Sequence, residues 1–362
     1  MSKVRKLEIN SVNGNYFATF HPNIEALIEV IIGHEDVCVL IDLEISKLYP
    51  KLMLVLPTNK YFIVVSNEVN KSLSKVTEIS EWLMNSGATK TTHLVGIGGG
   101  VVQDLSTFVS HIYYRGIDWT FFPTTLLSQA DSCVGSKCAL NLNGHKNQLG
   151  VVHTPKSVDI FIGFLETLPH SEIQSGFGEI AKLAVTGQNE FLTYFKTHLR
   201  DYGISTNHLD EIIYSSLNAK KFVVDQDEYE SDLRRVLNYG HSFGHALESL
   251  TNNSIVHGDA VVIGMDIINF IGQRREITDI DFYLEMRELF EEFFSHIKLE
   301  KHFDSKEWVQ ELKHDKKMRH GNMNFAIPVR NGDIRIFSTE LDNDLVLLVG
   351  EYLETSPFFN PS

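Results

Sequence analysis

The chain has 362 residues, of which 43% are hydrophobic and 22% charged, and this composition is typical of a soluble globular protein with a large core. Its formal net charge of −15 argues against a general nucleic-acid-binding protein, which would present a basic face. No stretch approaches the roughly 20 apolar residues of a membrane span. The first residues, MSKVRKLEINSV, carry charge with no apolar run behind them, unlike a secretory signal.

The chain contains three cysteines, Cys38, Cys133 and Cys138, and no CxxC pair. Because the number is odd, a disulfide framework is not expected, and a reducing compartment is the simpler interpretation. We therefore expect a cytoplasmic protein that binds neither nucleic acid nor a membrane.

The first part of the chain alternates short β-branched runs with helical patterns. Strands are expected at 37–42, 61–66 and 118–123, and a further strand at 92–100 runs into a glycine turn. Between them, helical patterns cover 70–87, which ends at a glycine, and 101–114. Strand–helix–strand alternation predicts a parallel sheet with helices on its faces.

The pattern changes near residues 165–176, and beyond this point long helical patterns dominate. They cover 177–198, 207–225, 239–251, 258–275 and 279–296. The second half is therefore expected to be a mostly helical domain, and the cleft between two such domains is a natural place for a ligand.

The glycine turn GIGGGVVQD places Gly98, Gly99 and Gly100 between a strand and a helix. Backbone N–H groups at such a turn can approach a phosphate, and the helix N-terminus adds partial positive charge. The turn lacks the GxGxxG fingerprint, and a tight structural turn explains it equally well. Asp104 could contact a nucleotide hydroxyl or amide, or could complement the helix dipole.

Several charged side chains fall inside apolar helical patterns in the second half. Glu179 and Lys182 lie three residues apart, so they are expected to be paired, bound to a ligand or in a cleft. His241 and His245, four apart, share a helix face, although such a pair is often structural. Glu179, His241 and His257 together would suit a catalytic Zn²⁺ with positions left open for substrate.

The order and spacing of many motifs resemble the 3-dehydroquinate synthase family of the sugar phosphate cyclase superfamily. From about residue 61 to 317 these motifs are NEVNK, GIGGGVVQD, YYRG, PTTLLSQADS, HKNQLG, LETLP, SGFGEIAK, LNYGHSFGHALE and HGDAVVIGM. The resemblance implies an α/β dinucleotide-binding domain with a parallel sheet over 1–168. It also implies a mostly α-helical metal- and substrate-binding domain over 169–362. NAD, a divalent metal (Zn²⁺, with Co²⁺ as the alternative) and a homodimer are implied as well.

Matching the motifs position by position assigns expected roles. The implied metal ligands are Glu179, His241 and His257. The implied NAD contacts are Asp42, Glu68, Lys71, Gly99, Gly100, Val101, Val102, Asp104, Thr124, Thr125, Lys137, Lys146, Phe164 and Thr167. The implied substrate and catalytic groups are Arg115, Asp131, Lys137, Asn147, Lys182, Lys220, Arg234, Asn238 and His245. Lys146 is a further substrate candidate, as is one of Lys316 and Lys317.

The resemblance implies conversion of 3-deoxy-D-arabino-heptulosonate 7-phosphate to 3-dehydroquinate and phosphate. The implied steps are transient oxidation by NAD⁺, phosphate elimination, re-reduction and aldol closure. Three features depart from the family pattern: Gln103 replaces a glycine, GSKCAL replaces GGKTG, and the aspartate usual before LETLP is replaced within DIFIGF. An aminated analogue of the substrate therefore stays open.

Proteins of other classes share parts of this pattern. A metal-dependent NAD alcohol or glycerol dehydrogenase would have the same architecture but would accumulate NADH. A binding protein that has lost catalysis would be expected to lose metal ligands. The inventory of lysines and arginines favours a phosphorylated sugar acid as the small-molecule partner.

Overall fold

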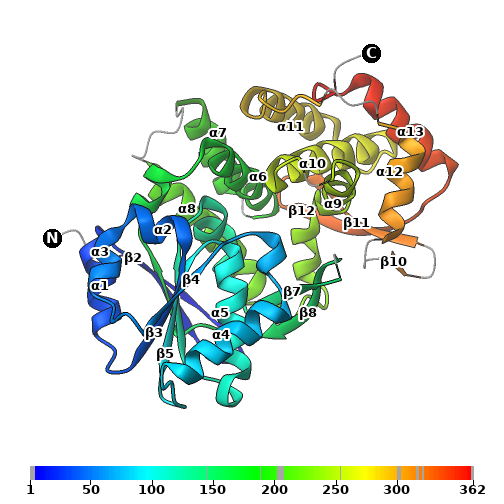
Figure 1. Cartoon of the computed structure of the whole chain (residues 1–362). Coiled ribbons are helices and arrows are strands. Elements are labelled where there is room, and N and C mark those ends of the chain that lie inside the picture. The colour runs from blue at the N-terminus through cyan, green and yellow to red at the C-terminus, as the bar shows by residue number, and fades with distance from the viewer. Residues whose placement is uncertain are drawn as a thin grey trace. The chain divides into compact units, whose positions relative to one another are not determined.

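The computed structural model describes residues 5–143, 145–187, 189–201, 208–252, 254–299, 303–314, 318–319 and 322–359 (Figure 1). The chain divides into two compact units, Met1–Pro169 and His170–Ser362. The sequence analysis places its domain boundary one residue earlier, after residue 168. Which ligand each unit binds stays a prediction.

The first unit contains a seven-stranded sheet in the order β1-β2-β9-β6-β5-β3-β4, and only the pair β1 and β2 is antiparallel. The predicted parallel sheet is therefore confirmed. The elements of this unit are β1 Arg5–Ile9, β2 Tyr16–Phe20, α1 Ile24–Ile32, β3 Val37–Asp42, α2 Leu43–Leu48, α3 Pro50–Leu54, β4 Tyr61–Val64, η1 Glu68–Asn70, α4 Leu73–Asn85, β5 His93–Gly98, α5 Gly100–Ile112, η2 Tyr113–Arg115, β6 Trp119–Pro123, η3 Ser128–Ser132, β7 Lys137–Leu142, β8 His145–Val152, β9 Ser157–Ile160 and η4 Ile162–Thr167.

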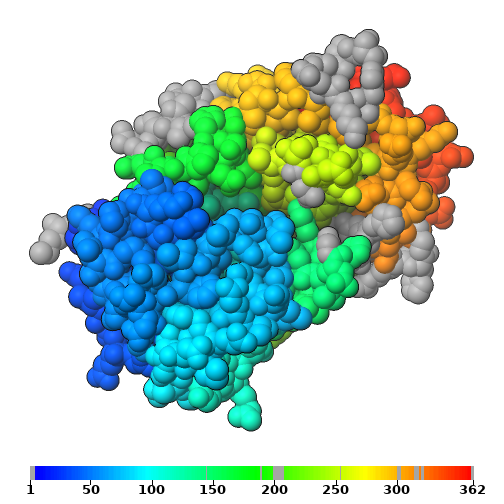
Figure 2. Space-filling view, in the orientation of Figure 1, coloured from blue at the N-terminus to red at the C-terminus, as the bar shows by residue number. Residues whose placement is uncertain are grey.

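Alternate residues of the central strands face opposite layers, as the two-residue period of a strand requires. Val39 and Ile41 of β3 and Val95 and Ile97 of β5 pack in one buried cluster with residues of α1, α2 and α3. Helix α5 packs against β5 from the other side, where a side chain on Gly96 would meet Ser106. Strand β5 is buried along its whole length, with helices packed on both of its faces. Figure 2 shows the surface of the first unit in blue to green colours.

A two-stranded antiparallel hairpin, β7 with β8, stands apart from the main sheet. The polar motif HKNQLG has the composition of a turn, but a turn interpretation is wrong here, since Lys146 and Asn147 both lie in strand β8. Asn147 has a positive φ of 55°. Asparagine adopts this left-handed conformation more readily than most residues, which explains the turn-like composition.

The second unit is mostly helical, as predicted. Its elements are α6 His170–Thr186, α7 Asn189–Asp201, α8 Leu209–Val224, η6 Leu233–Asn238, α9 His241–Leu250, α10 His257–Arg274, α11 Ile280–Phe293, α12 Ser305–Glu311, η7 Leu312–His314, β10 Met318–Arg319, β11 Asn322–Arg330, β12 Asp333–Glu340 and α13 Asn343–Thr355. The single helix predicted over 177–198 is wrong: α6 ends at Thr186, Gly187 is not helical, and α7 begins at Asn189.

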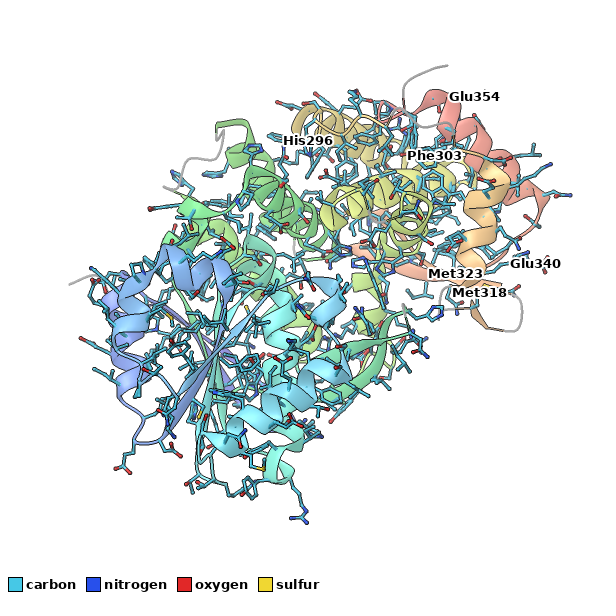
Figure 3. All side chains as sticks on the ribbon, viewed as in Figure 1. His296, Phe303, Met318, Met323, Glu340 and Glu354 are labelled. Atoms are coloured by element: carbon cyan, nitrogen blue, oxygen red, sulfur yellow. The ribbon has the colours of Figure 1, made fainter. Side chains whose placement is uncertain are left out.

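The second unit also contains a small antiparallel sheet that the sequence analysis does not predict, in the order β10-β11-β12. Met318 of β10 pairs with Met323 of β11, and both side chains are labelled in Figure 3. None of the described helices in either unit combines the length and apolar character needed to cross a bilayer.

Helix α10 is the centre of the second unit and is buried from Gly258 to Gly272. It packs against both α6 and α9. The crossing with α6 is close because Gly258 has no side chain: a Cβ there would lie 1.9 Å from the backbone oxygen of Ser175. This close packing brings the start of α10 next to the middle of α6.

Candidate metal and substrate site

Three side chains from three helices of the second unit meet: two histidines lie against the carboxylate of a glutamate. Glu179 is in α6, His241 begins α9 and His257 begins α10. The Nε2 atoms of His241 and His257 lie 3.4 Å and 3.0 Å from Glu179 Oε1. One ligand atom from each residue lies within 4.8 Å of the others. The sequence-predicted metal triad is thus brought together, and this donor set suits a divalent cation such as Zn²⁺.

The backbone around these residues explains why they meet. Glu179 is on the face of α6 that crosses α10, and His257 immediately precedes Gly258 at this crossing. Gly240, just before His241, has a φ of 78°, which a residue with a side chain rarely adopts. The sharp turn at Gly240 starts α9 with His241 in its first position.

Burial and neighbouring charges set the protonation of the cluster. Burial alone would raise the pKa of Glu179, but Lys182, His241 and His257 outweigh it and hold that pKa well below its usual range. Burial lowers the pKa of His241 against the opposing effect of Glu179. Burial would also lower the pKa of His257, but Glu179 and Glu248 raise it to about 10. The carboxylate is therefore ionised and ready to act as a ligand.

Lys182 forms an ion pair with Glu179 Oε2, the oxygen that does not face the histidines. Both side chains are almost fully buried, at 4% and 2% exposure. Of the expected alternatives for Glu179 and Lys182 (a pair, a bound ligand or a cleft), the structure shows the pair. The two oxygens of Glu179 thus have different partners: Oε2 pairs with Lys182, and Oε1 faces the two histidines.

The face of α9 that begins at His241 carries two further polar residues, His245 and Glu248. The rings of His241 and His245 are 5.3 Å apart, and His245 is exposed. Glu248 is 6% exposed and its Oε2 lies 3.4 Å from His257 Nδ1. The sequence analysis misses Glu248, although its spacing of seven from His241 places both on one helix face.

Other predicted substrate residues of the second unit lie on elements that pack against α6. Lys220 is in α8 and Arg234 in η6, and both are buried at 8% exposure. Asn238 ends η6, where its Nδ2 donates to Glu230 Oε1 at 2.6 Å. The Arg234 guanidinium donates to the backbone oxygen of Glu228. Lys316 and Lys317 lie outside the described residues.

Asp227, which the sequence analysis overlooks, organises the loop that leads to η6. Its Oδ1 accepts the backbone N–H of Ser231 at 2.8 Å and that residue's hydroxyl at 2.9 Å. Its Oδ2 accepts the backbone N–H groups of Asp232 at 2.8 Å and Arg234 at 3.0 Å. One carboxylate thus fixes the chain on which Arg234 is held.

In the first unit most predicted NAD contacts gather at the carboxyl edge of the parallel sheet. Asp42 ends β3, Gly99 and Gly100 follow β5, and Thr124 and Thr125 follow β6. This edge is where open α/β sheets bind their ligands. A Cβ on Gly100 would meet no atom within 4 Å, so the start of α5 has open space beside it. A phosphate fits such a helix N-terminus.

Lys71 joins the segment after β4 to the glycine turn and to the β7–β8 hairpin. Its Nζ lies 2.7 Å from Asp104 Oδ2 and donates to Asn147 Oδ1 at 2.8 Å. Asn141, which the sequence analysis misses, donates to Glu68 Oε2 at 2.7 Å and accepts the N–H of Asn147 at 2.9 Å. Four predicted residues therefore form one polar network.

Asp131 lies in η3, the short helical turn after β6, and is 7% exposed. The hydroxyl of the neighbouring Ser132 donates to Gln103 Oε1 at 2.5 Å, and Gln103 Nε2 donates to the backbone oxygen of Ser132 at 2.7 Å. The residue that departs from the family pattern at position 103 thus attaches α5 to the turn that carries Asp131. Lys137 begins β7 and is exposed, as is Lys146 in β8.

Some predicted NAD contacts also have clear structural roles. Asp42 caps α2 by accepting two backbone N–H groups, both on Oδ1. Phe164 and Val102 are core residues, with 1% and 0% exposure. A bound nucleotide would therefore contact their backbone atoms rather than their side chains. Thr167 is exposed and accepts from or donates to the Tyr49 hydroxyl. Val101 lies in the first turn of α5.

Arg115 is not brought to this edge. It follows the far end of α5, a helix of 13 residues and therefore roughly 20 Å long. It is exposed and has a positive φ of 61°. Within the first unit the structure separates Arg115 from the glycine turn.

Comparison with known proteins agrees with this arrangement. The profile for the 3-dehydroquinate synthase N-terminal domain matches residues 61–175, and that for the C-terminal domain matches residues 176–318. The 3-dehydroquinate synthase of Alkaliphilus oremlandii (strain OhILAs) is 32% identical over 336 residues, which cover 92% of this chain and 91% of the relative.

Two solved structures share the fold. A 2-deoxy-scyllo-inosose synthase complexed with carbaglucose-6-phosphate, NAD⁺ and Co²⁺ superposes with a TM-score of 0.82 at 21% identity, over 96% of this chain and 99% of that one. The 2-epi-5-epi-valiolone synthase of Streptomyces hygroscopicus subsp. jinggangensis 5008, with NAD⁺ and Zn²⁺ bound, gives 0.81 at 21% identity and the same coverage. The chain thus has the fold of these two synthases, together with a group of side chains that could hold a metal ion. The chain belongs to the 3-dehydroquinate synthase family.

Proposed function

We propose that this chain is a 3-dehydroquinate synthase, a phosphorus–oxygen lyase that converts 3-deoxy-D-arabino-heptulosonate 7-phosphate to 3-dehydroquinate and phosphate. The observation that carries the proposal is the convergence of Glu179, His241 and His257 in a member of this family. Lys182, Lys220 and Arg234 supply positive charge in the same unit. The function rests on these residues rather than on the fold, which dehydrogenases can share.

The residues present fit both expected cofactors. Glu179, His241 and His257 are the donor types of catalytic Zn²⁺ sites, which leave a position open. The open space beside Gly100, at a helix N-terminus, suits the phosphates of NAD. When bound, a divalent cation supplies a Lewis acid that lowers the pKa of a substrate hydroxyl, and NAD⁺ supplies a hydride acceptor that returns the hydride later in the cycle.

The chain's own residues would bind and orient the substrate. The planar guanidinium of Arg234 suits bidentate binding of a carboxylate. Lys182 and Lys220 would act as point charges toward the carboxylate or the phosphate. His245, exposed one turn beyond His241, would hold a proton at a ring nitrogen and pass it between substrate and solvent.

The proposal also includes the substrate class, the cellular location and the oligomeric state. The substrate is a phosphorylated sugar acid, the location is cytoplasmic, and the working form is a homodimer. The three buried cysteines, which form no disulfide, support a reducing compartment. In size-exclusion chromatography, an apparent mass near twice the chain mass of 41.1 kDa would support the dimer.

The test is an assay of the purified chain with NAD⁺ and Zn²⁺ or Co²⁺ on heptulosonate phosphates with and without the carboxylate, and on the aminated analogue. We expect phosphate release from the carboxylated substrate with no lasting rise in absorbance at 340 nm. Lasting NADH accumulation without phosphate release would instead indicate a dehydrogenase. Faster turnover of the aminated or the uncarboxylated compound would assign a different cyclase. Glu179→Gln provides the inactive control.

A further inference from the structure

Each of the two imidazoles of the cluster has polar partners at both of its ring nitrogens. Their Nε2 atoms approach Glu179 Oε1. On the opposite side, His241 Nδ1 lies 3.2 Å from the backbone oxygen of Tyr239. His257 Nδ1 lies 3.4 Å from Glu248 Oε2. Each ring thus has an oxygen at Nδ1 and turns Nε2 toward the centre of the cluster.

Both nitrogens of His257 face a carboxylate, so without a cation this ring carries a hydrogen on each nitrogen. A cation at the Nε2 atoms would take the place of a hydrogen there, and the oxygen at Nδ1 would then select one tautomer of each ring. A neutral imidazole has one N–H and one lone pair, and an acceptor at Nδ1 keeps the hydrogen there. The lone pair of Nε2 then points at the place a cation would occupy. Metal-binding histidines commonly donate their second nitrogen to a carbonyl or carboxylate, which fixes the ring and raises its basicity. For His241 the acceptor is a backbone carbonyl, which no substitution can remove.

We infer that Glu248 is the positioning residue for His257: its carboxylate accepts the Nδ1–H and holds Nε2 toward the metal. The inference rests on the proposed function, because it takes Glu179, His241 and His257 as the metal ligands. Glu248 itself does not contact the cation in this scheme. It acts only through His257.

The position of Glu248 in the fold supports this role. It lies two turns beyond His241 on α9, and its side chain is almost fully buried. A carboxylate is costly to bury unless polar partners surround it. Ligand-capable atoms of His245, Glu248 and His257 lie within 4.8 Å of one another, so the carboxylate is aimed at histidines. The next residue, Ser249, is exposed and its hydroxyl donates to Glu311 instead.

The experiment compares metal binding by the stripped full-length chain and its variants. Zn²⁺ affinity is measured by competition with a chelator, and the visible absorption of Co²⁺ reports the ligand geometry. The variants are Glu248→Gln, Glu248→Ala and, as the matched control on the same helix, Ser249→Ala. Thermal unfolding of each metal-free form shows whether the fold is intact.

We expect Glu248→Ala to weaken Zn²⁺ binding about 10- to 100-fold and to shift the Co²⁺ spectrum. Glu248→Gln should lose less, because its amide oxygen still accepts the Nδ1–H. Ser249→Ala should match the wild type. Equal affinity and spectra in wild type and Glu248→Ala would overturn the inference and leave the proposed function standing. If the alanine variant does not fold, Glu248→Met takes its place, since it keeps the side-chain length and removes the acceptor, and wild-type metal affinity in Glu248→Met would overturn the inference. A wild-type chain that binds neither Zn²⁺ nor Co²⁺ would overturn both.

Discussion

The side chain of Arg234 is almost fully buried, although arginine is a residue that usually reaches solvent. Its backbone N–H is bound to Asp227, and its guanidinium donates to the Glu228 carbonyl. These contacts fix the direction of the side chain before any ligand arrives. A guanidinium held in this way loses little entropy when it binds a planar carboxylate.

At the residue scale, we expect Arg234→Ala to lower kcat/KM for the carboxylated substrate by about 100-fold or more, roughly 3 kcal/mol, with bound metal unchanged. Arg234→Lys should recover only part of the loss, since an ammonium lacks the forked geometry. The neighbouring Arg235→Ala in the same η6 turn is the control. The measurement is steady-state kinetics with metal analysis of each protein. Equal kcat/KM in Arg234→Ala and wild type would remove Arg234 from the substrate site.

Which residues could be predicted at this scale depends on where their partners come from. Glu179 and Lys182 were predictable because two charges in an apolar helix must have partners. Glu248 and Asn141 were missed because their partners, His257 and Glu68, lie in other elements. Asp227 binds a loop rather than a helix, so no periodic pattern marks it. Only the helical spacing of Glu248 from His241 offered a signal.

At the scale of elements, the loop between α8 and η6 depends on Asp227. Hydrogen bonds from three backbone N–H groups and from a hydroxyl hold the pKa of this carboxyl well below its usual range, against a burial effect that would raise it. The depressed pKa means that the folded chain favours the ionised form. Asp227 therefore stabilises the fold at pH values above the ordinary aspartate pKa. This contribution is lost as the pH falls toward the depressed value.

We expect Asp227→Asn to lower the free energy of unfolding by about 2 kcal/mol at pH 7, because the anionic acceptor of these bonds is removed. The difference from wild type should shrink steadily below pH 4, where protonation of Asp227 in the unfolded chain begins. Urea unfolding across this pH range measures it. KM for the substrate should rise as Arg234 loses its support. A difference between the two proteins that stays constant down to pH 2 would contradict the assigned role.

Elements with strong local patterns were predicted, and those whose signal lies in a turn were missed. The strands β3, β5 and β6 are continuous apolar runs between helices, so both type and order followed from the sequence. The hairpin β11–β12 was overlooked although Asn331 and Gly332 form its two-residue turn between Arg330 and Asp333. Asn-Gly is a strong hairpin signal, and Gly332 has the positive φ that it requires. This signal was overlooked because helical patterns dominate the rest of the second half of the chain.

At the scale of the whole molecule, the two expected cofactors belong to different units. The proposed metal ligands lie in the second unit, and the glycine turn lies in the first. Each ligand stabilises the structure that binds it, because it binds the folded form and not the unfolded one. Each ligand should therefore slow amide hydrogen exchange in the unit that binds it.

We expect Zn²⁺ to slow amide hydrogen exchange in α6, α9 and α10, and NAD⁺ to slow it at the turn between β5 and α5. At a free Zn²⁺ concentration of 100 times Kd the stabilisation is about 2.7 kcal/mol, so amides that exchange by unfolding of the second unit should slow by about 100-fold. Exchange mass spectrometry with each ligand alone measures this. Glu179→Gln should abolish the effect of Zn²⁺ and keep that of NAD⁺. Protection by Zn²⁺ that persists in Glu179→Gln, or that is absent from all three helices, would show that the cation binds elsewhere.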